Sequence, residues 1–367
     1  MRVTCARDEL AGKLALAGRA ASSKSTIQIL SHVRLSADDG SVEAAATDME
    51  LSLRAPVEGT VEERGSVVLP RLAADVVRAM APGPVTLEHR AGEGSASLSG
   101  GQSAFALNCL QADDFPELPT DAGAGVAAPA DRLVAAVERV ARAASRDETR
   151  PVLTGVLLRL GPDGMTMVAT DSYRLALRRA SLEAGPTEPQ EAVVPARALQ
   201  EAARLATQTR AEAVEIVLGE SQALFRVGPA RLTSRLIDGQ FPDYRQLVPD
   251  AFDHDVVFDR GELLGVLTRI GVLAQRSVPL RLAFAQGEVT VSAVSEQLGE
   301  GRESIPVPFS GEPLEIGFNA EFLRDGVDAI DGDEVRLGLI SPLRPGLLRG
   351  ADEEGFRYLL MPIRLNA

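Results

Sequence analysis

The chain is built from three copies of one unit, and this internal repeat constrains its fold more than any other feature. Each third of the 367 residues opens with a segment that has a polar start and apolar residues at spacings of three and four, as an amphipathic helix requires. These segments are residues 7–22, 130–145 and 260–275. A repeat of this length predicts tandem copies of one domain rather than unrelated domains.

A strand pair follows this helix in each third. Residues 32–57 and 155–180 alternate apolar and polar side chains and turn at Asp-Gly, the strongest short hairpin signal. Both contain Ala-Thr-Asp, which ends at Asp48 and at Asp171, whereas the third copy, 281–307, turns at Gln-Gly and lacks the aspartate. We interpret the two aspartates as turn residues rather than as paired catalytic acids, because each occupies the same place in a different unit.

A second helix and a closing segment complete each unit. The second helices are predicted within residues 67–80, 192–206 and 316–330, each directly after a strand. The closing segments, which we expect to form hairpins, are residues 112–119, 238–249 and 358–365. The fold class is therefore α+β, with three tandem similar domains at residues 1–120, 127–249 and 253–367.

Composition excludes several classes of protein. A formal charge of −14 argues against a surface that is basic all over, but it leaves room for a local basic face. No apolar run matches a signal peptide or a membrane span, so we expect a cytoplasmic protein. With 2 cysteines, 3 scattered histidines and no P-loop, HExxH or GxSxG motif, we expect no metal, no cofactor and no enzymatic activity.

Arginines gather on the predicted helices although the chain is acidic. Residues 130–146 carry four arginines and residues 196–210 carry three. Cations three or four residues apart lie on one face of a helix, and such a face can meet phosphates without reading bases. The alternative is an ordinary solvated helix face, and the acidic last helix, 321–333, breaks the pattern.

Three segments, taken with the repeat, carry a resemblance to a known family. They are ATDSYRLA at 169–176, FPDYRQLVP at 241–249 and MPIRL at 361–365. With them the chain resembles, over essentially its whole length, the bacterial DNA polymerase III beta subunit, the sliding clamp. The resemblance implies a DNA clamp fold and a head-to-tail homodimer that forms a six-domain ring, with helices lining a central hole around duplex DNA. It implies a processivity factor whose partners are replicative and repair polymerases and the clamp loader, with no role for a membrane.

The resemblance also implies three sets of site residues. A peptide-binding cleft between the second and third domains would use Leu153, Thr170, Ser172, Tyr173, Arg174, Leu175, Pro242, Leu247, Pro345, Leu360, Met361, Pro362, Ile363 and Arg364. The expected DNA-facing residues are Lys24, Arg71, Arg142, Arg146 and Arg197. The expected dimer contacts are Phe105 and Leu107 on one side and Val272 and Leu273 on the other.

Several alternatives stay open at this point. Ser172-Tyr173 stands where Gly-His is frequent in the family, and Gln246 replaces a common basic residue, so the peptide preference of the cleft is not fixed. Each apolar candidate has core packing as its simpler explanation. A specialised paralogous clamp, for example one that confers resistance to a clamp-binding inhibitor, and a repeat scaffold without a DNA role are the competing functions.

Overall fold

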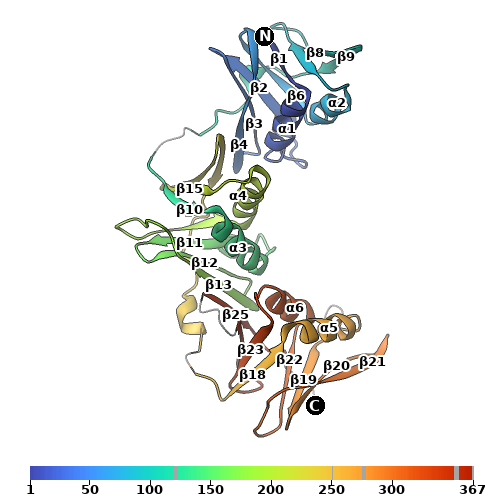
Figure 1. Ribbon diagram of the computed structural model, residues 1–367, viewed down its shortest axis with the longest axis vertical. Helices are drawn as coiled ribbons and strands as arrows, with labels where there is room; N and C mark the ends of the chain where they lie inside the picture. Colours follow the sequence, from blue (N-terminus) through green and yellow to red (C-terminus); the bar gives the residue numbers. More distant parts are fainter. Residues whose placement is uncertain (120–122, 250, 275–277, 351–354, 366–367) are drawn as a thin grey trace. The chain divides into compact units, whose positions relative to one another are not determined.

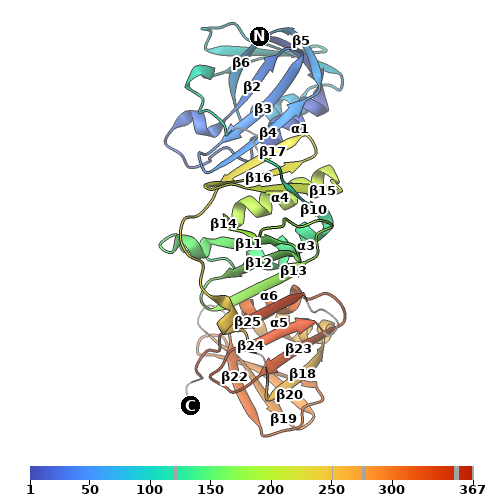
Figure 2. The ribbon, with the colours of Figure 1, turned by 90° about the vertical axis from the view of Figure 1, so that its left-hand side faces the viewer.

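The structure is a computed structural model that describes residues 1–119, 123–249, 251–274, 278–350 and 355–365. The chain divides into two compact units, and the division passes through its middle third. The first unit is Met1–Ala130 with Arg204–Leu236, and the second is Asp131–Ala203 with Ile237–Ala367. Each unit contains two antiparallel sheets with helices beside them (Figures 1 and 2).

The first unit holds a five-stranded and an eight-stranded sheet. The smaller has the order β5 (Gly59–Glu63), β1 (Arg2–Ala6), β7 (Pro84–Glu88), β8 (Ser95–Gly100) and β9 (Ser103–Asn108). The larger has the order β10 (Val126–Pro129), β15 (Ala213–Leu218), β16 (Gln222–Val227), β17 (Ala230–Arg235), β4 (Leu51–Val57), β3 (Ser41–Thr47), β2 (His32–Asp38) and β6 (Gly65–Pro70). The larger sheet is continuous from the first third of the chain into the second, because β4 pairs with β17.

The second unit repeats this plan. Its eight-stranded sheet has the order β14 (Gln190–Pro195), β11 (Gly155–Gly161), β12 (Gly164–Thr170), β13 (Arg174–Ala180), β25 (Phe356–Leu360), β24 (Gly346–Gly350), β23 (Glu334–Leu339) and β18 (His254–Asp259). Its four-stranded sheet has the order β21 (Gly299–Pro306), β20 (Glu288–Ser295), β19 (Leu280–Ala285) and β22 (Leu314–Phe318). Here β13 pairs with β25, so the second and third parts of the chain also share a sheet.

Two helices accompany each third of the chain. They are α1 (Arg7–Ala17), α2 (Ala73–Ala79), α3 (Ala130–Val140), α4 (Ala196–Thr209), α5 (Arg260–Gly271) and α6 (Ala320–Asp328). In the first unit α1 packs against α2 and against β3 and β4, and in the second α5 packs against α6. Among the described residues no helix is both long and apolar enough to cross a membrane.

The hairpin turns that the sequence predicts are confirmed. Asp39 and Gly40 between β2 and β3 have φ angles of 38° and 83°, the left-handed pair of a type I′ turn. Gly164 and Gly287 also have positive φ, 125° and 79°, at the turns into β12 and β20. Glycine adopts these angles without steric cost, so the turn residues set the register of all three hairpins.

Two details of the prediction were wrong. The opening helices are shorter than expected: α1 ends before Gly18, α5 ends at Gly271, and α3 is followed by a 3₁₀ turn, η3 (Ala141–Ala143). Glycine has low helix propensity, and last turns often tighten into 3₁₀ geometry. The segments at 112–119 and 238–249 form 3₁₀ turns rather than hairpins, since their prolines cannot donate to a sheet ladder.

Candidate functional site

The turn between β12 and β13 is built by Thr170 and Asp171. Asp171 Oδ1 accepts hydrogen bonds from the backbone N–H groups of Tyr173 (2.9 Å) and Arg174 (3.0 Å). Thr170 Oγ1 donates to the carbonyl of Arg174 (2.7 Å) and accepts from the N–H of Ser172 (3.2 Å). These bonds hold Ser172 at φ 79°, a left-handed conformation that is uncommon for a residue with a side chain.

The first unit contains the same turn one repeat earlier. Asp48 Oδ1 accepts from the N–H groups of Glu50 (3.1 Å) and Leu51 (2.8 Å), and Met49 has φ 78°. The interpretation of Asp48 and Asp171 as turn residues is therefore confirmed. In both units the strand that leaves this turn is the one that pairs with a strand from the following third of the chain.

Arg174 is the most heavily bonded side chain at the junction of β13 and β25. It is buried, and its Nε donates to Asp171 Oδ2 (3.1 Å). Its Nη1 donates to Asp325 Oδ2 of α6 (2.7 Å) and to Tyr358 Oη of β25 (3.1 Å). Its Nη2 donates to the carbonyl of Arg142 in η3 (2.7 Å). One guanidinium thus ties β13 to η3, α6 and β25.

Tyr358 is positioned to accept the bond from Arg174. Burial is the main cause that raises the pKa of Tyr358 above its ordinary value, so the phenol stays protonated at neutral pH. The guanidinium of Arg174 also lies over the ring of Phe322, 4.1 Å from its centroid. Arg174 is expected from the resemblance to contact a partner peptide, whereas the bonds described above all run within the chain.

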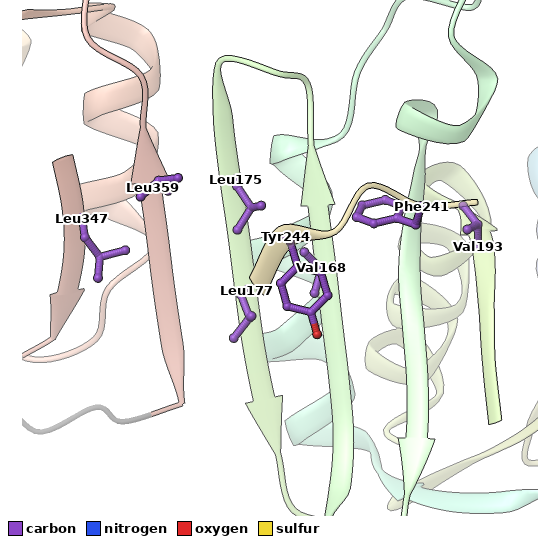
Figure 3. Packing of buried hydrophobic residues seen from close by; sticks show 8 residues of the cluster. All are labelled: Val168, Leu175, Leu177, Val193, Phe241, Tyr244, Leu347 and Leu359. Atoms are coloured by element: carbon purple, nitrogen blue, oxygen red, sulfur yellow. The ribbon is translucent and has the colours of Figure 1, made fainter. Parts of the chain in front are cut away.

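Strand alternation separates the candidate residues of β13 and β25 onto two faces. Leu175 pairs with Leu359, and both belong to a buried cluster with Tyr244 and Phe241 (Figure 3). Arg174 pairs with Leu360, which therefore lies on the opposite face and is 1% exposed. Leu359 was not among the sequence candidates, although alternation from Leu175 across the ladder identifies it once the strand pairing is known.

Exposed apolar side chains lie on or directly beside the segments that carry this cluster. Tyr173, Leu247 and Met361 are 63%, 49% and 43% exposed, and the N–H of Met361 donates to the carbonyl of Tyr173 (2.9 Å). Of the other candidates, Ser172, Pro242 and Arg364 are exposed, Pro345, Pro362 and Ile363 are half-buried, and Leu153 and Thr170 are buried. Large exposed apolar side chains on adjoining segments are typical of a protein-binding surface.

The expected DNA-facing residues differ in how exposed they are. Lys24, Arg71, Arg146 and Arg197 are exposed. Arg142 is half-buried, and its Nη1 donates to Asp328 Oδ2 (3.0 Å) and to the carbonyl of Asp325 (3.3 Å). Part of its charge is therefore neutralised within the second unit, and the exposed members are the better candidates for phosphate contacts.

The expected dimer contacts lie on sheet edges and at a helix end. Phe105 (40% exposed) and Leu107 lie on β9, the edge strand of the five-stranded sheet. Val272 (61% exposed) and Leu273 follow α5, and Leu273 lies against Gly301 of β21. β21 is an edge strand of the four-stranded sheet, so in each unit the expected dimer contacts lie on or beside an edge strand.

Comparison with known proteins gives one consistent result. Models of the N-terminal, central and C-terminal domains of the DNA polymerase III beta subunit match residues 1–119, 127–243 and 245–364. The chain is 34% identical to the beta sliding clamp of Synechococcus elongatus and 33% identical to that of Streptomyces coelicolor, with 100% of both chains covered in each case. It is also similar to the crystal structure of the DNA polymerase sliding clamp from Bacillus subtilis, at 28% identity, a TM-score of 0.92 and full coverage of both chains. The chain therefore belongs to the DNA polymerase III beta subunit family.

Proposed function

We propose that this protein is a DNA sliding clamp, a processivity factor that encircles duplex DNA and tethers polymerases to it. The observation that carries the proposal is the match of all three family domains, in order, along the chain. A closed ring stays on DNA because it cannot leave sideways, so it needs neither base contacts nor strong phosphate contacts. The charge of −14 is compatible with this mechanism, since an acidic exterior repels DNA everywhere except at a locally basic lining.

The proposed DNA contacts are weak and independent of sequence. Lys24 and Arg71 of the first unit and Arg146 and Arg197 of the second are exposed and suited to transient phosphate contacts. Tight binding would hinder sliding. The ion pair of Arg142 with Asp328 is consistent with this requirement, because it moderates the positive charge beside η3.

Ring closure is proposed to follow from the repeat itself. In the first unit β4 pairs with β17, and in the second β13 pairs with β25. The strand of the third repeat that is equivalent to β4 and β13 is β21, an edge strand of its sheet. The strand of the first repeat that is equivalent to β17 and β25 is β9, which is also an edge strand. Pairing β21 of one copy with β9 of another repeats the junction a third time. This head-to-tail contact closes after two copies and gives six domains.

Partner recognition is proposed to use the apolar surface around Tyr173, Leu247 and Met361. A short peptide from a replicative or repair polymerase, or from the clamp loader, would bury its apolar side chains there. Methionine offers an adaptable contact that suits several partners. The remaining cleft candidates, including Arg174 and Leu360, would hold the strands that carry this surface in place, Arg174 through its hydrogen bonds and Leu360 through its burial.

The proposal includes a location and the absence of catalysis. We infer that the protein works in the cytoplasm and acts by tethering alone, without a metal or cofactor. A specialised paralogous clamp shares all of these properties, and the comparisons do not favour it. A repeat scaffold without a DNA role predicts no retention on circular DNA.

The topological mechanism has a direct test. The protein is loaded by a clamp loader onto a nicked circular plasmid and isolated by gel filtration, and the plasmid is then cut once. We expect a species of about twice 38.8 kDa in free solution, retention on the circle and release on cutting. A linear plasmid whose ends are blocked by bound streptavidin is the matched control and should retain the protein. Equal retention on open linear and circular DNA would refute the mechanism.

A further inference from the structure

The outer face of the β11–β13 sheet carries a row of polar residues beside its apolar cluster. Cα pairing places Arg159 opposite Thr166, and Thr166 opposite Arg179, so the three side chains lie in register on one face. They are two residues beyond Leu157, Val168 and Leu177, which pack in one cluster with Phe241 and Tyr244 of the 237–249 segment (Figure 3). The cover ends at Tyr244 and Arg245, and the polar row lies just past it.

A pocket of about 310 Å³ opens at this place. The Arg159–Thr166–Arg179 row lines it together with Tyr244 and Arg245 and with the 161–164 turn. Three guanidinium groups therefore line one hollow, with Asp163 as the single carboxylate among its lining residues. The charged lining residues therefore carry a net positive charge, although the chain as a whole is acidic.

The three arginines of this pocket differ from arginines such as Arg174, whose guanidinium bonds within the chain. Among the residues that the structure describes, none of the side chains of Arg159, Arg179 and Arg245 makes a hydrogen bond or an ion pair. Glu191 lies opposite Arg159 in the β11–β14 ladder, yet the two form no ion pair. Arg245 rests over the ring of Tyr244, 5.1 Å from its centroid. The guanidinium donors thus remain available to a ligand.

Tyr244 adds a hydroxyl to the lining of the pocket. The residue is 6% exposed, and its hydroxyl has no hydrogen-bond partner in the described part of the chain. In Figure 3 this hydroxyl points along the sheet past Leu177, toward the end of β13 at which Arg179 lies. The hydroxyl is not one of the buried unpaired polar atoms of the described residues, so it opens to the pocket and can bond to a ligand there together with the three guanidinium groups.

The position of the pocket favours a partner polypeptide over DNA as its ligand. Arg174 and Arg178 lie on the other face of β13, where Arg174 bonds to η3. Burial is the main cause that lowers the pKa of Arg178, and the nearby charge of Arg139 on α3 lowers it further. The pocket therefore faces away from α3 and from η3, which carries the expected DNA contact Arg142. It adjoins the apolar surface instead, because Tyr244 and Leu247 belong to one 3₁₀ turn, η5 (Tyr244–Leu247).

We propose that this pocket binds a carboxylate side chain of a partner polypeptide whose apolar residues occupy the surface around Tyr173, Leu247 and Met361. Guanidinium groups match carboxylates in geometry and charge, and the Tyr244 hydroxyl supplies a further donor. The inference rests on the proposed function for the identity of the partner. It adds an acidic residue, beside the apolar motif, to what the protein recognises.

The chain has three tyrosines, and each reports on a different place. Tyr244 lines the pocket, Tyr173 lies on the apolar surface, and Tyr358 is buried at the junction. Full-length protein labelled with 3-fluorotyrosine is titrated with acetylated, amidated triglutamate and observed by fluorine NMR. We expect only the Tyr244 resonance to shift, and we expect triglutamine to leave it unchanged.

Variants test whether the arginines cause the shift. Arg159→Gln combined with Arg179→Gln should raise the dissociation constant of triglutamate at least tenfold, while unchanged Tyr173 and Tyr358 resonances show that the fold is intact. Arg64→Gln combined with Arg90→Gln is the charge-matched control, since Arg64 and Arg90 are 66% and 88% exposed in the first unit. An equal loss in both variants, or no shift of Tyr244 in the wild type, would overturn the proposal.

Further titrants separate the source of the anion. A Tyr244 shift with inorganic phosphate or with a 20-base-pair duplex, but not with triglutamate, overturns the carboxylate assignment. If triglutamate binds only after the chain's own Asp352, Glu353 and Glu354, which lie outside the described residues, are neutralised, the assignment to a partner polypeptide is overturned. A peptide from the clamp-contacting tail of the replicative polymerase, extended by three glutamates or three glutamines, tests the partner. A Tyr173 shift without a Tyr244 shift overturns the pocket proposal alone, whereas no Tyr173 shift refutes the proposed peptide surface.

Discussion

Replacing Arg174 by methionine should weaken the junction between β13 and β25 substantially. The change keeps the aliphatic stem but removes every donor, so Asp171, Asp325 and Tyr358 each lose a hydrogen bond. The side chains of Asp171 and Asp325 are 13% and 24% exposed, so neither recovers full hydration. Breaking a buried ion pair by removing one partner costs about 3–5 kcal/mol. Because Asp325 keeps some access to water, we expect the lower end, about 3 kcal/mol.

The measurement is thermal and urea unfolding of the full chain. A loss of about 3 kcal/mol lowers the midpoint of the affected transition by roughly 6–12 °C for a cooperative unit of this size. Arg281→Met is the matched control, because Arg281 pairs with Glu315 at 2.7 Å and the two side chains are 42% and 45% exposed. Exposed ion pairs contribute about 0–1 kcal/mol, so this variant should unfold within about 3 °C of the wild type.

Comparison of the two variants tests whether the buried bonds of Arg174 stabilise the junction. If Arg174→Met unfolds at the same midpoint as Arg281→Met, burial of the Arg174 network does not stabilise the junction, and the structural role assigned to it fails. If it unfolds early but still binds polymerase peptide with unchanged affinity, Arg174 acts in the fold and not in peptide contact.

Three further predictions concern the surfaces and the thiols. Val272→Glu places a charge at the proposed subunit contact and should shift the protein from dimer to monomer in sedimentation, whereas Ile27→Glu, at a site exposed to a similar extent (58% against 61%), should not. Met361→Glu should weaken binding of a fluorescent polymerase peptide at least tenfold in an anisotropy titration, and Leu72→Glu, at a 60% exposed site, should leave it unchanged. Burial, helped by the charge of Glu9, raises the pKa of Cys5 to about 11, so at pH 8 its thiolate is about a hundred times scarcer than that of an unperturbed thiol. Iodoacetamide should therefore modify Cys5 only after the protein unfolds. Rapid modification of the native protein would contradict the burial of this thiol.

The local features of the fold could be read from the sequence because they depend on neighbouring residues. Alternation and an Asp-Gly turn predicted the β2–β3 hairpin, and the repeated aspartates predicted the turns at Asp48 and Asp171. Pairing between distant strands leaves no such local pattern. The continuity of β4 with β17 and of β13 with β25 was therefore not predicted, and neither was the face on which Leu359 lies.

The arginine pocket shows the same limit at the level of a site. Arg159 and Arg179 are twenty residues apart in the sequence, and each alone suggests an ordinary solvated side chain. Only the register of β11, β12 and β13 brings them into one row, and only the course of the 238–249 segment places Tyr244 beside them. The segment was expected to form a hairpin, and its sequence does not indicate which part of the sheet it covers.

The two junctions within the chain share one register, and this strengthens the proposal for the third. Ser234 pairs with Leu51 and Arg231 with Arg54, while Leu360 pairs with Arg174 and Arg357 with Leu177. The residues of β25 follow those of β17 by 126 positions at both points, and those of β13 follow those of β4 by 123.

By the same rule Leu107 of β9 occupies the place of Ser234 and Leu360, since Ser103 and Ala230 begin equivalent hairpin strands. A contact of β9 with β21 of a second copy would thus reuse a register that the chain forms twice. The two internal junctions are held at high effective concentration by the connecting chain, and one of them also by Arg174. The junction between copies has neither support, so on this proposal it is the place at which the ring opens to admit DNA.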